Sequence, residues 1–462
     1  MRRHPMRYHT LSIRQLWDKA EETPFKSNEY LNREVLDKLK QNLDSPKIEI
    51  LYGPRQSGKT TLLMFLIDHL NAAGVNPANI WYVNLDLISD YSLFDSVEKF
   101  LYLYDNSQVE GKLYLFIDEI QRLAAPGLFL KGIYDSRRNI KVFISGSASF
   151  EIKAKIKEAL TGRKRLHLVL PLSFRETVKA KGVIPAGLYE QKINPDNIDA
   201  WIKADDAFGK YLAEELENAL VYGLYPGVYA TDGLEPKLEE LNEIYNSYLK
   251  KDVFDYFKID RPDTFNNLVA VLGSQVGNLV NISELCSLLA STRSTTEKYI
   301  EILKDTFIIS LLPPFTSNKR SEIKSASKIY FNDPGIRNLT QKKMSPISGR
   351  PDAGSVIENM VFIEMQKNVK LLDDIYYWRT KSKAEVDFVY SREDRITPVE
   401  VKTGSAVIGT LTRSFHSFIE AHNPPKAFFL NKDKLAYMKV NQTDVYYVPL
   451  HWFLIAGSDM ID

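Results

Sequence analysis

The chain has 462 residues, of which 44% are hydrophobic and 26% are charged, and its formal net charge is +1. This composition is ordinary for globular domains, and the near-zero charge excludes a global field that would draw the chain to nucleic acid or membrane. The single cysteine, Cys286, excludes a disulfide within the chain, and no apolar run approaches a membrane span, so we expect a cytoplasmic protein with no membrane partner.

Residues 1–45 are predicted to form polar lead-in helices that pack beside the following domain. Leu31, Val35, Leu36 and Leu39 recur at helical spacing and would lie on one stripe. Arg33 is on the same helix, where it either approaches a bound nucleotide or is solvated.

A phosphate-binding loop follows at Gly53-x-x-x-x-Gly58-Lys59-Thr60, between a predicted strand at 47–51 and a predicted helix at 60–70. The glycines let successive backbone N–H groups turn toward a phosphate, and the helix start adds its positive dipole end. Lys59 is expected to reach the β and γ phosphates of ATP, and the Thr60 hydroxyl to bind Mg²⁺. The predicted cofactor-binding residues are Gly53, Pro54, Arg55, Gln56, Ser57, Gly58, Lys59, Thr60 and Thr61.

Residues 46–170 alternate between apolar strands and helical stretches, which predicts a parallel sheet covered on both faces. The predicted strands are 47–51, 80–85, 112–117, 141–145 and 166–170. Ligands of such sheets bind beyond the carboxyl ends of the strands, so polar residues at those ends are site candidates.

Two of these strands end in polar residues. The third runs into Asp118, which would hold Mg²⁺, and Glu119, which would orient and deprotonate the attacking water. The fourth ends in Ser145, whose hydroxyl either senses the γ-phosphate or belongs to a plain turn. A helix predicted at 150–160 ends before Arg163, a candidate arginine finger acting in its own site or in that of a neighbouring copy. Only the second alternative would require a homo-oligomer.

These segments together resemble a large group of prokaryotic AAA+-like ATPases that carry a C-terminal domain of unknown function. The resemblance rests on GPRQSGKTTLL, FIDEIQRL, SGSASFEI and LTGRKRLHLVLPLSFRE, and extends to the turn at 222–226 and the stretch 248–252. It implies the AAA+ type of sheet with an adjoining helical lid, which we assign to residues 171–258. It implies no substrate.

Residues 259–345 are predicted to form a winged helix, from helices at 265–272, 283–290 and 294–304 and a hairpin of strands at 307–315 and 328–331. The third helix would be the recognition helix. The candidate nucleic-acid contacts are Arg293, Thr295 and Lys298 near its start and Lys319 and Arg320 in the wing. A winged helix used only for packing or protein contacts is the alternative.

Residues 346–462 resemble a PD-(D/E)xK nuclease core. Glu358 lies on a helix predicted at 355–369, Asp387 on a strand at 384–390, and Glu400 and Lys402 on a strand at 396–402. The two-residue period puts Glu400 and Lys402 on one face, and Asp387 can meet Glu400 across the strands. Asp387 and Glu400, with Glu358 as a further ligand, would bind Mg²⁺, and Lys402 would position water or stabilise charge. A half-exposed sheet with outward charges is the plainer reading.

The sequence therefore predicts an α/β protein with an AAA+-like P-loop NTPase sheet, a helical lid, a winged helix and a nuclease-like domain. The expected activity is Mg²⁺-dependent ATP hydrolysis that is coupled to the engagement or cleavage of DNA. One alternative is a nucleotide-operated switch that binds a protein partner, with an inactive nuclease-like domain. Another is a motor that remodels DNA without cutting it.

Overall fold

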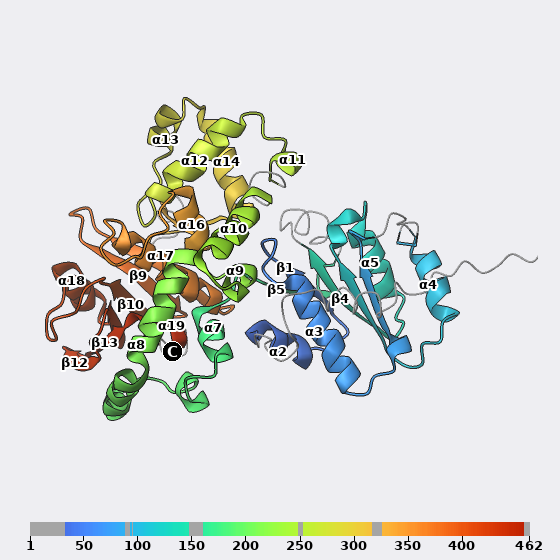
Figure 1. Cartoon of the computed structure of the whole chain (residues 1–462), viewed down its shortest axis with the longest axis horizontal. Helices are drawn as coiled ribbons and strands as arrows, with labels where there is room; N and C mark the ends of the chain where they lie inside the picture. The colour runs from blue at the N-terminus through green and yellow to red at the C-terminus, as the bar shows by residue number, and fades with distance from the viewer. Residues whose placement is uncertain are drawn as a thin grey trace, which may run out of the picture. The chain divides into compact units, whose positions relative to one another are not determined.

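The computed structural model describes residues 33–87, 93–94, 96–146, 160–247, 253–316 and 326–456. The chain divides into two compact units, Met1–Pro171 and Leu172–Asp462, and Figure 1 labels the elements of each. The predicted lead-in residues 1–32, the predicted helix at 150–160 except Leu160, and the stretch 248–252 lie outside the described residues.

The first unit is built on a five-stranded sheet whose strands are all parallel, as predicted. The strand order is β2-β3-β4-β1-β5. The strands are β1 (Ile48–Tyr52), β2 (Ile80–Asn84), β3 (Leu113–Asp118), β4 (Ile140–Gly146) and β5 (Lys164–Leu168). β5 begins two residues before its predicted start, because its polar first residues, Lys164 and Arg165, also pair with β1. Polar residues are tolerated there because β5 is an edge strand with exposed positions.

Helices cover both faces of this sheet, which confirms the layered α/β arrangement. On one face α2 (Glu34–Gln41) and α3 (Lys59–Ala72) bury leucines against Phe116 and Phe143. On the other face α4 (Val97–Asp105) and α5 (Pro126–Asp135) bury aromatic and aliphatic side chains against β1, β3 and β4. Short 3₁₀ turns at Pro77–Asn79 and Ile120–Arg122 precede β2 and follow β3.

The strand order brings the polar strand ends together. Because β4 lies between β1 and β3, its end at Ser145 and Gly146 lies between the loop after β1 and Asp118 at the end of β3. All three ends are at the carboxyl edge of a parallel sheet, where ligands of this architecture bind.

The second unit begins with helices. They are α7 (Phe174–Ala180), α8 (Ile198–Tyr222), α9 (Pro226–Ala230), α10 (Leu234–Ile244) and α11 (Val253–Phe257), with 3₁₀ turns at Ala186–Tyr189 and Pro195–Asn197. Where the structure describes it, the segment predicted as the lid, 171–258, is thus mostly helical, and from Leu172 onward it belongs to the second unit. Within that unit α8 packs on α19 (Leu450–Ala456), where the rings of Trp201 and Trp452 meet edge to face at 5.2 Å.

Three helices and a two-stranded ribbon come next, in the order predicted for the winged helix. The helices α12 (Pro262–Ser274), α13 (Ile282–Leu288) and α14 (Arg293–Asp305) lie together in Figure 1. The strands β6 (Ile309–Leu312) and β7 (Lys328–Phe331) pair antiparallel. Lys319 and Arg320 lie in the segment 317–325, outside the described residues.

The C-terminal part is a mixed six-stranded sheet with helices on both faces. After α16 (Pro334–Thr340) and α17 (Ala353–Asn368), the strand order is β12-β13-β11-β10-β9-β8. The strands are β8 (Asp373–Arg379), β9 (Glu385–Arg392), β10 (Arg395–Val401), β11 (Lys426–Asn431), β12 (Ala436–Val440) and β13 (Thr443–Pro449). β8, β9 and β10 are antiparallel, whereas β10, β11 and β13 are parallel, and α18 (Arg413–His422) packs on the sheet through Phe415 and Phe418. None of the helices in the described ranges is long and apolar enough to cross a membrane.

Candidate nucleotide site and carboxylate–lysine cluster

The loop between β1 and α3 has the backbone that its glycines predict. Gly53 and Gly58 have positive φ angles of 152° and 92°, a region that side-chain-bearing residues rarely adopt. A Cβ atom at Gly53 would lie 2.2 Å from the backbone oxygen of Val169, so only glycine fits there. Gln56 also has a positive φ, and the buried Ser57 hydroxyl donates to the Pro54 carbonyl at 2.9 Å. The loop is therefore closed by its own backbone and by the chain after β5.

Lys59 points into the loop that it follows. Its side chain is 5% exposed, and Nζ donates to the carbonyl oxygens of Pro54 at 2.6 Å and Gly53 at 3.2 Å. Burial lowers the pKa of Lys59 to about 8, although the charges of Glu119 and Asp118 act in the opposite direction. The ammonium is thus bonded to two backbone carbonyls of the loop and lies within the influence of the charges of Asp118 and Glu119.

Asp118 joins three of the strands at the carboxyl edge of the sheet. Its Oδ2 accepts hydrogen bonds from the Thr60 hydroxyl at 2.7 Å and the Tyr82 hydroxyl at 3.1 Å. Its Oδ1 accepts one from the Ser145 hydroxyl. A buried carboxylate beside a threonine hydroxyl is a set of oxygen donors that suits Mg²⁺.

Glu119 follows Asp118 with a left-handed backbone. Its φ is 57°, a costly conformation for a residue with a side chain, and such outliers cluster at functional sites. Its N–H donates to the Ser145 hydroxyl at 3.3 Å, and the Gln121 amide donates to its carboxylate. Ser145 therefore contacts both acidic residues, which is more than a plain strand-end turn requires.

Arg33 supports this loop from α2's N-terminal end. It is 8% exposed, and its guanidinium donates to the carbonyl oxygens of Ser57 and Leu170, each at 2.9 Å. Arg33 is therefore not solvated, and these two bonds go to the loop backbone. Sequence reasoning did not find this role or that of Tyr82, whose only signal was a polar hydroxyl inside a buried strand.

Arg163 lies away from its own phosphate loop. It directly precedes β5, and its backbone oxygen accepts from the N–H of Ile48 at the start of β1, so it is at the amino edge of the sheet. Its guanidinium pairs with Asp135 at 3.0 Å and lies over the Tyr134 ring. The structure does not bring Arg163 to the Thr60–Asp118 region of its own chain.

The second unit brings together the acidic residues and the lysine that the nuclease resemblance singled out. The antiparallel register pairs Phe388 with Val399, which places Asp387 beside Glu400 across β9 and β10. Lys402 Nζ lies 2.7 Å from Glu400 Oε1, and the Asp387 carboxylate accepts the N–H of Val401 at 2.8 Å. Their predicted proximity is therefore present.

Glu358 on α17 belongs to the same cluster, but its partners come from β7. Its Oε1 lies 2.6 Å from the Tyr330 hydroxyl and 3.1 Å from Lys328 Nζ. Lys328 Nζ also lies 2.6 Å from Glu385 Oε1. Sequence reasoning missed Lys328, Tyr330 and Glu385. The available signal was a lysine and a tyrosine two residues apart in KIYF, a buried strand whose alternate residues share a face.

The carboxylates of this cluster are unusually basic. Burial, followed by the charge of Asp387, raises the pKa of Glu358 and that of Glu400 to about 7, and burial raises the pKa of Asp387. Glu400 Oε2 is buried and has no hydrogen-bond partner among the described residues. Even so, within the described part of the chain no three acidic, histidine or cysteine side chains converge to hold a metal ion. The predicted ligands Glu358 and Glu400 are instead bonded to lysines.

The predicted recognition helix α14 begins with exposed polar side chains. Arg293 pairs with Glu297 at 2.8 Å on the same helix, and both side chains are largely exposed. Thr295 donates its N–H to the N-cap hydroxyl of Thr292. Lys298 is exposed one turn further along. These side chains are accessible at one helix end but form no closed site.

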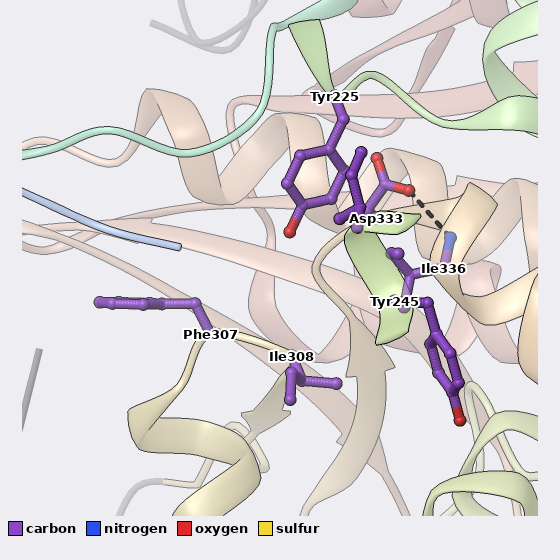
Figure 2. A pocket seen from close by; sticks show the side chains of 7 residues that line it. Tyr225, Tyr245, Phe307, Ile308, Asp333 and Ile336 are labelled. Carbon is purple, nitrogen blue, oxygen red and sulfur yellow. Dashed lines mark hydrogen bonds between the residues drawn. The ribbon is translucent and has the colours of Figure 1, made fainter. Parts of the chain in front are cut away.

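A small hollow in the second unit is not a candidate site. It is lined by Tyr225, Ile244, Tyr245, Phe307, Ile308, Asp333 and Ile336, and Figure 2 shows these side chains with the Asp333 carboxylate turned to the Ile336 N–H. The cavity has a volume of about 10 Å³, about enough for one water molecule, so no nucleotide fits.

Comparison with known proteins assigns each part of the chain separately. Residues 45–178 match the AAA domain family, 213–346 a domain of unknown function (DUF8612), and 353–453 another domain of unknown function (DUF4143). An uncharacterized protein of Haemophilus influenzae is 27% identical over 81% of this chain and 87% of its own length. An uncharacterized protein of Methanocaldococcus jannaschii is 27% identical over 80% of this chain and 77% of its own length.

Among solved structures, the ADP form of the ORC2 protein of Aeropyrum pernix is 12% identical and covers 70% of this chain and 98% of its own. Its TM-score of 0.32 is too low to support a shared overall arrangement or function. The family match and the geometry of the loop between β1 and α3 agree for the first unit. Residues 45–178 therefore have a P-loop NTPase fold and match the AAA domain family, and the later segments match two domains of unknown function.

Proposed function

We propose that the chain binds MgATP at the loop 53–61 and hydrolyses it. The single observation that carries this proposal is the 2.7 Å hydrogen bond from the Thr60 hydroxyl to Asp118 Oδ2. It joins the end of the phosphate loop to the acidic end of β3, two segments that are both needed for phosphoryl transfer and are 58 residues apart.

Each side chain of this site has a proposed role that follows from its chemistry. Lys59 would exchange the carbonyls of Gly53 and Pro54 for phosphate oxygens, and the loop N–H groups would bind the remaining oxygens. Thr60 and Asp118 would hold Mg²⁺, which supplies charge neutralisation at the transferred phosphoryl group. Glu119 would orient the attacking water and accept its proton, and Ser145 would hold Glu119 and Asp118 in place.

The test is steady-state ATP hydrolysis by the full chain. We expect Glu119→Gln to bind ATP but to hydrolyse it ~100-fold or more slowly, because the water-activating carboxylate is lost. Lys59→Ala should lose both binding and hydrolysis. Glu110→Gln and Lys131→Ala remove an exposed acid and an exposed lysine of the same unit and are the matched controls. An unchanged rate in Glu119→Gln would remove the proposed mechanism.

A second candidate function, metal-dependent phosphodiester hydrolysis, is supported by one specific observation in the other unit. Glu400 Oε2 is buried and lacks a hydrogen-bond partner within the described ranges, and Glu400 lies beside Asp387 with the ammonium of Lys402 on its Oε1. A buried carboxylate oxygen without a donor is costly unless a cation or a proton occupies the place. In this proposal Asp387 and Glu400, with Glu358, bind the cation, and Lys402 stabilises the developing charge.

Cleavage of single- and double-stranded DNA with Mg²⁺ or Mn²⁺ tests this candidate. Glu400→Gln and Lys402→Ala should abolish cleavage, whereas Glu393→Gln and Lys381→Ala, which change exposed residues of the same domain, should leave it unchanged. Cleavage that survives in Lys402→Ala would point to a contaminating nuclease and against this site.

Engagement of DNA by the start of α14 completes the proposal. Arg293, Thr295 and Lys298 are at the accessible N-terminal end of this helix, where phosphates are well received. Replacing Arg293 or Lys298 by alanine should reduce the salt dependence of DNA binding by about one phosphate contact each. Lys304→Ala, at the other end of α14, is the control. DNA binding without any salt dependence would instead favour the nucleotide-operated switch that binds a protein partner.

A further inference from the structure

Lys328 is a buried lysine whose ammonium lies among carboxylates. Its side chain is 2% exposed. Its Nζ lies 2.6 Å from Glu385 Oε1 and 3.1 Å from Glu358 Oε1, and it lies over the Tyr377 ring. Its charge also interacts with Asp387, whose pKa it acts to lower. A lysine this deep is retained only where its charge is compensated, and here the compensation comes from β9 and α17.

The ammonium of Lys328 does for Glu358 what a metal ion would do. It neutralises the carboxylate and takes up one of its oxygens, while the Tyr330 hydroxyl donates to the same oxygen at 2.6 Å. The glycine at position 277 closes the remaining side, since a Cβ there would lie 3.1 Å from Glu358 Oε2. Glu358 is therefore held by Lys328 and Tyr330 rather than turned outward for another ligand.

At the other end of the cluster, Lys402 neutralises Glu400 but leaves one of its oxygens unbonded. Glu400 is 4% exposed, and no atom in the described part of the chain bonds its Oε2, although Lys402 and Thr412 bond its Oε1. A buried carboxylate oxygen next to Asp387 that lacks a donor leaves room in the cluster for a proton or for a further cation. To be bound by three carboxylates, a further cation must also contact Glu358. Lys328 already pairs with the Glu358 carboxylate.

We propose that Lys328 is the resident cation at Glu358 in the Glu358–Asp387–Glu400 cluster, and that a divalent cation of the Mg²⁺ type binds there in competition with it. This inference rests on the second proposed function, which supplies the metal site, and adds a residue from outside the segment 353–453 that controls it. It accounts for three neighbouring acids that do not converge as metal ligands do, because the lysine holds Glu358 toward β7.

The experiment measures Mn²⁺ binding by electron paramagnetic resonance on the full chain without nucleotide. Lys328→Met removes the ammonium and keeps the length of the side chain, and we expect Mn²⁺ to bind about tenfold or more tightly than in the wild type. Glu385→Gln removes one of the two carboxylates that hold Lys328 and none of the proposed ligands, and a smaller gain in affinity is expected. Lys141→Met replaces an equally buried, paired lysine of the first unit and should not change Mn²⁺ binding.

The possible results distinguish competition by Lys328 from the existence of the metal site itself. Equal Mn²⁺ affinity in the wild type, Lys328→Met and Glu385→Gln would overturn the competition while leaving the metal site in place. Folded variants that bind no Mn²⁺ at all would overturn both this inference and the second proposed function. If Lys328→Met does not fold, Glu385→Gln decides, since its side chain is partly exposed. Loss of the gain in Glu385→Gln/Glu400→Gln would confirm that the added affinity arises at this cluster.

Discussion

The Thr60 hydroxyl donates to Asp118 Oδ2 at 2.7 Å, and this bond connects the phosphate loop with the end of β3. Asp118 also accepts from Tyr82 on β2 and Ser145 on β4, so one carboxylate collects hydroxyls from three other parts of the sheet edge. Such a network fixes the carboxylate in one orientation before any ligand binds, which is the pre-organisation that an efficient cation site needs.

Removing either partner of this bond should impair hydrolysis far more than folding. We expect Thr60→Val, which keeps the shape of the side chain, to slow ATP hydrolysis by ~100-fold, because both a proposed Mg²⁺ ligand and a bond to Asp118 are lost. Thr60→Ser keeps the hydroxyl and should retain most activity. Hydrolysis rates at saturating MgATP, with thermal unfolding as the folding control, provide the measurement. Full activity in Thr60→Val would show that this bond has no catalytic role.

The lowered pKa of Lys59 predicts that nucleotide binding is coupled to proton uptake. Its pKa in the folded chain is lowered to about 8, whereas an unfolded lysine titrates near 10.4. Above pH 8 the side chain is therefore increasingly neutral, and phosphate groups that bind it must draw a proton from solvent. We expect ATP affinity to fall as pH rises through 8 to 9, with net proton uptake on binding at pH 8.5 and none at pH 7.

Calorimetry in buffers of different ionisation enthalpy measures that uptake. Lys59→Arg keeps a permanent charge, so any remaining ATP binding should show no such proton uptake. The same shift has a consequence for folding. Because the folded state holds fewer protons than the unfolded state between pH 8 and 10.4, this lysine opposes folding below pH 8 and does so less as pH rises through that window. Uptake that is equal at pH 7 and pH 8.5 would contradict the assignment.

The fold of the first unit was predictable because its signals are local. Alternating apolar strands and helices, and the spacing of Gly53, Gly58 and Lys59, specify a strand, a loop and a helix within a few residues. The support for that site was not predictable. Arg33 bonds Leu170, 137 residues away in the chain, and nothing near Arg33 in sequence marks that contact.

The second unit shows the same division. The proximity of Asp387, Glu400 and Lys402 follows from strand period and pairing, both of which can be read along the chain. The partner of Glu358 could not be read in this way. It is Lys328, on a strand that we assigned to a separate domain, and only the packing of α17 on β7 brings the two side chains together.

The place of Arg163 leads to a prediction about oligomers. Because it pairs with Asp135 at the amino edge of the sheet, it cannot serve the phosphate loop of its own chain in this arrangement. At dilutions where light scattering shows a monomer, Arg163→Ala should hydrolyse ATP within about twofold of the wild type. Arg138→Ala, which removes another exposed ion pair of this unit, is the control. A large loss in the monomer would contradict the placement.

If a finger acts between copies, mixing must reveal it. Arg163→Ala and Glu119→Gln would each be inactive in the assembly for different reasons. A mixture of the two would regain part of the activity at sites that combine an intact Glu119 with an intact Arg163 from the neighbouring copy.

Glu49 on β1, Lys141 on β4 and His167 on β5 form a buried ion cluster. We expect this cluster to dominate the stability of the first unit in acid. Glu49 is fully buried and lies 2.8 Å from Lys141 Nζ and 2.6 Å from His167 Nε2. Burial acts to raise the pKa of Glu49, but the hydrogen bonds from His167 and Lys141 outweigh it and leave the pKa lowered. A carboxylate with a depressed folded-state pKa contributes stability above its unfolded pKa of about 4.3 and loses that contribution as pH falls.

Lys141→Met should therefore destabilise the first unit at pH 7 by about 3 kcal/mol, because it leaves a buried carboxylate with fewer partners. The loss should shrink as pH falls below about 4.3, the ordinary glutamate pKa, because a proton on Glu49 removes the charge that Lys141 compensates. Urea unfolding at pH 7 and pH 3.5 measures both values, and Lys131→Ala on the exposed face of α5 is the control. Equal losses at the two pH values would show that the charge of Glu49 is not what Lys141 stabilises.

Arg33 should position the phosphate loop without touching the reacting groups. Its guanidinium donates to the Ser57 and Leu170 carbonyls at once. A lysine ammonium cannot reproduce both bonds, because it lacks the planar fork of N–H groups. We expect Arg33→Ala and Arg33→Lys each to weaken ATP binding by about tenfold, which corresponds to one or two lost charge-assisted bonds. The turnover at saturating ATP should change much less, since Thr60, Asp118 and Glu119 keep their contacts. Lys38→Ala, on the exposed face of the same helix, should change neither quantity, and a selective fall in turnover for Arg33→Ala would mean that Arg33 acts on the chemical step.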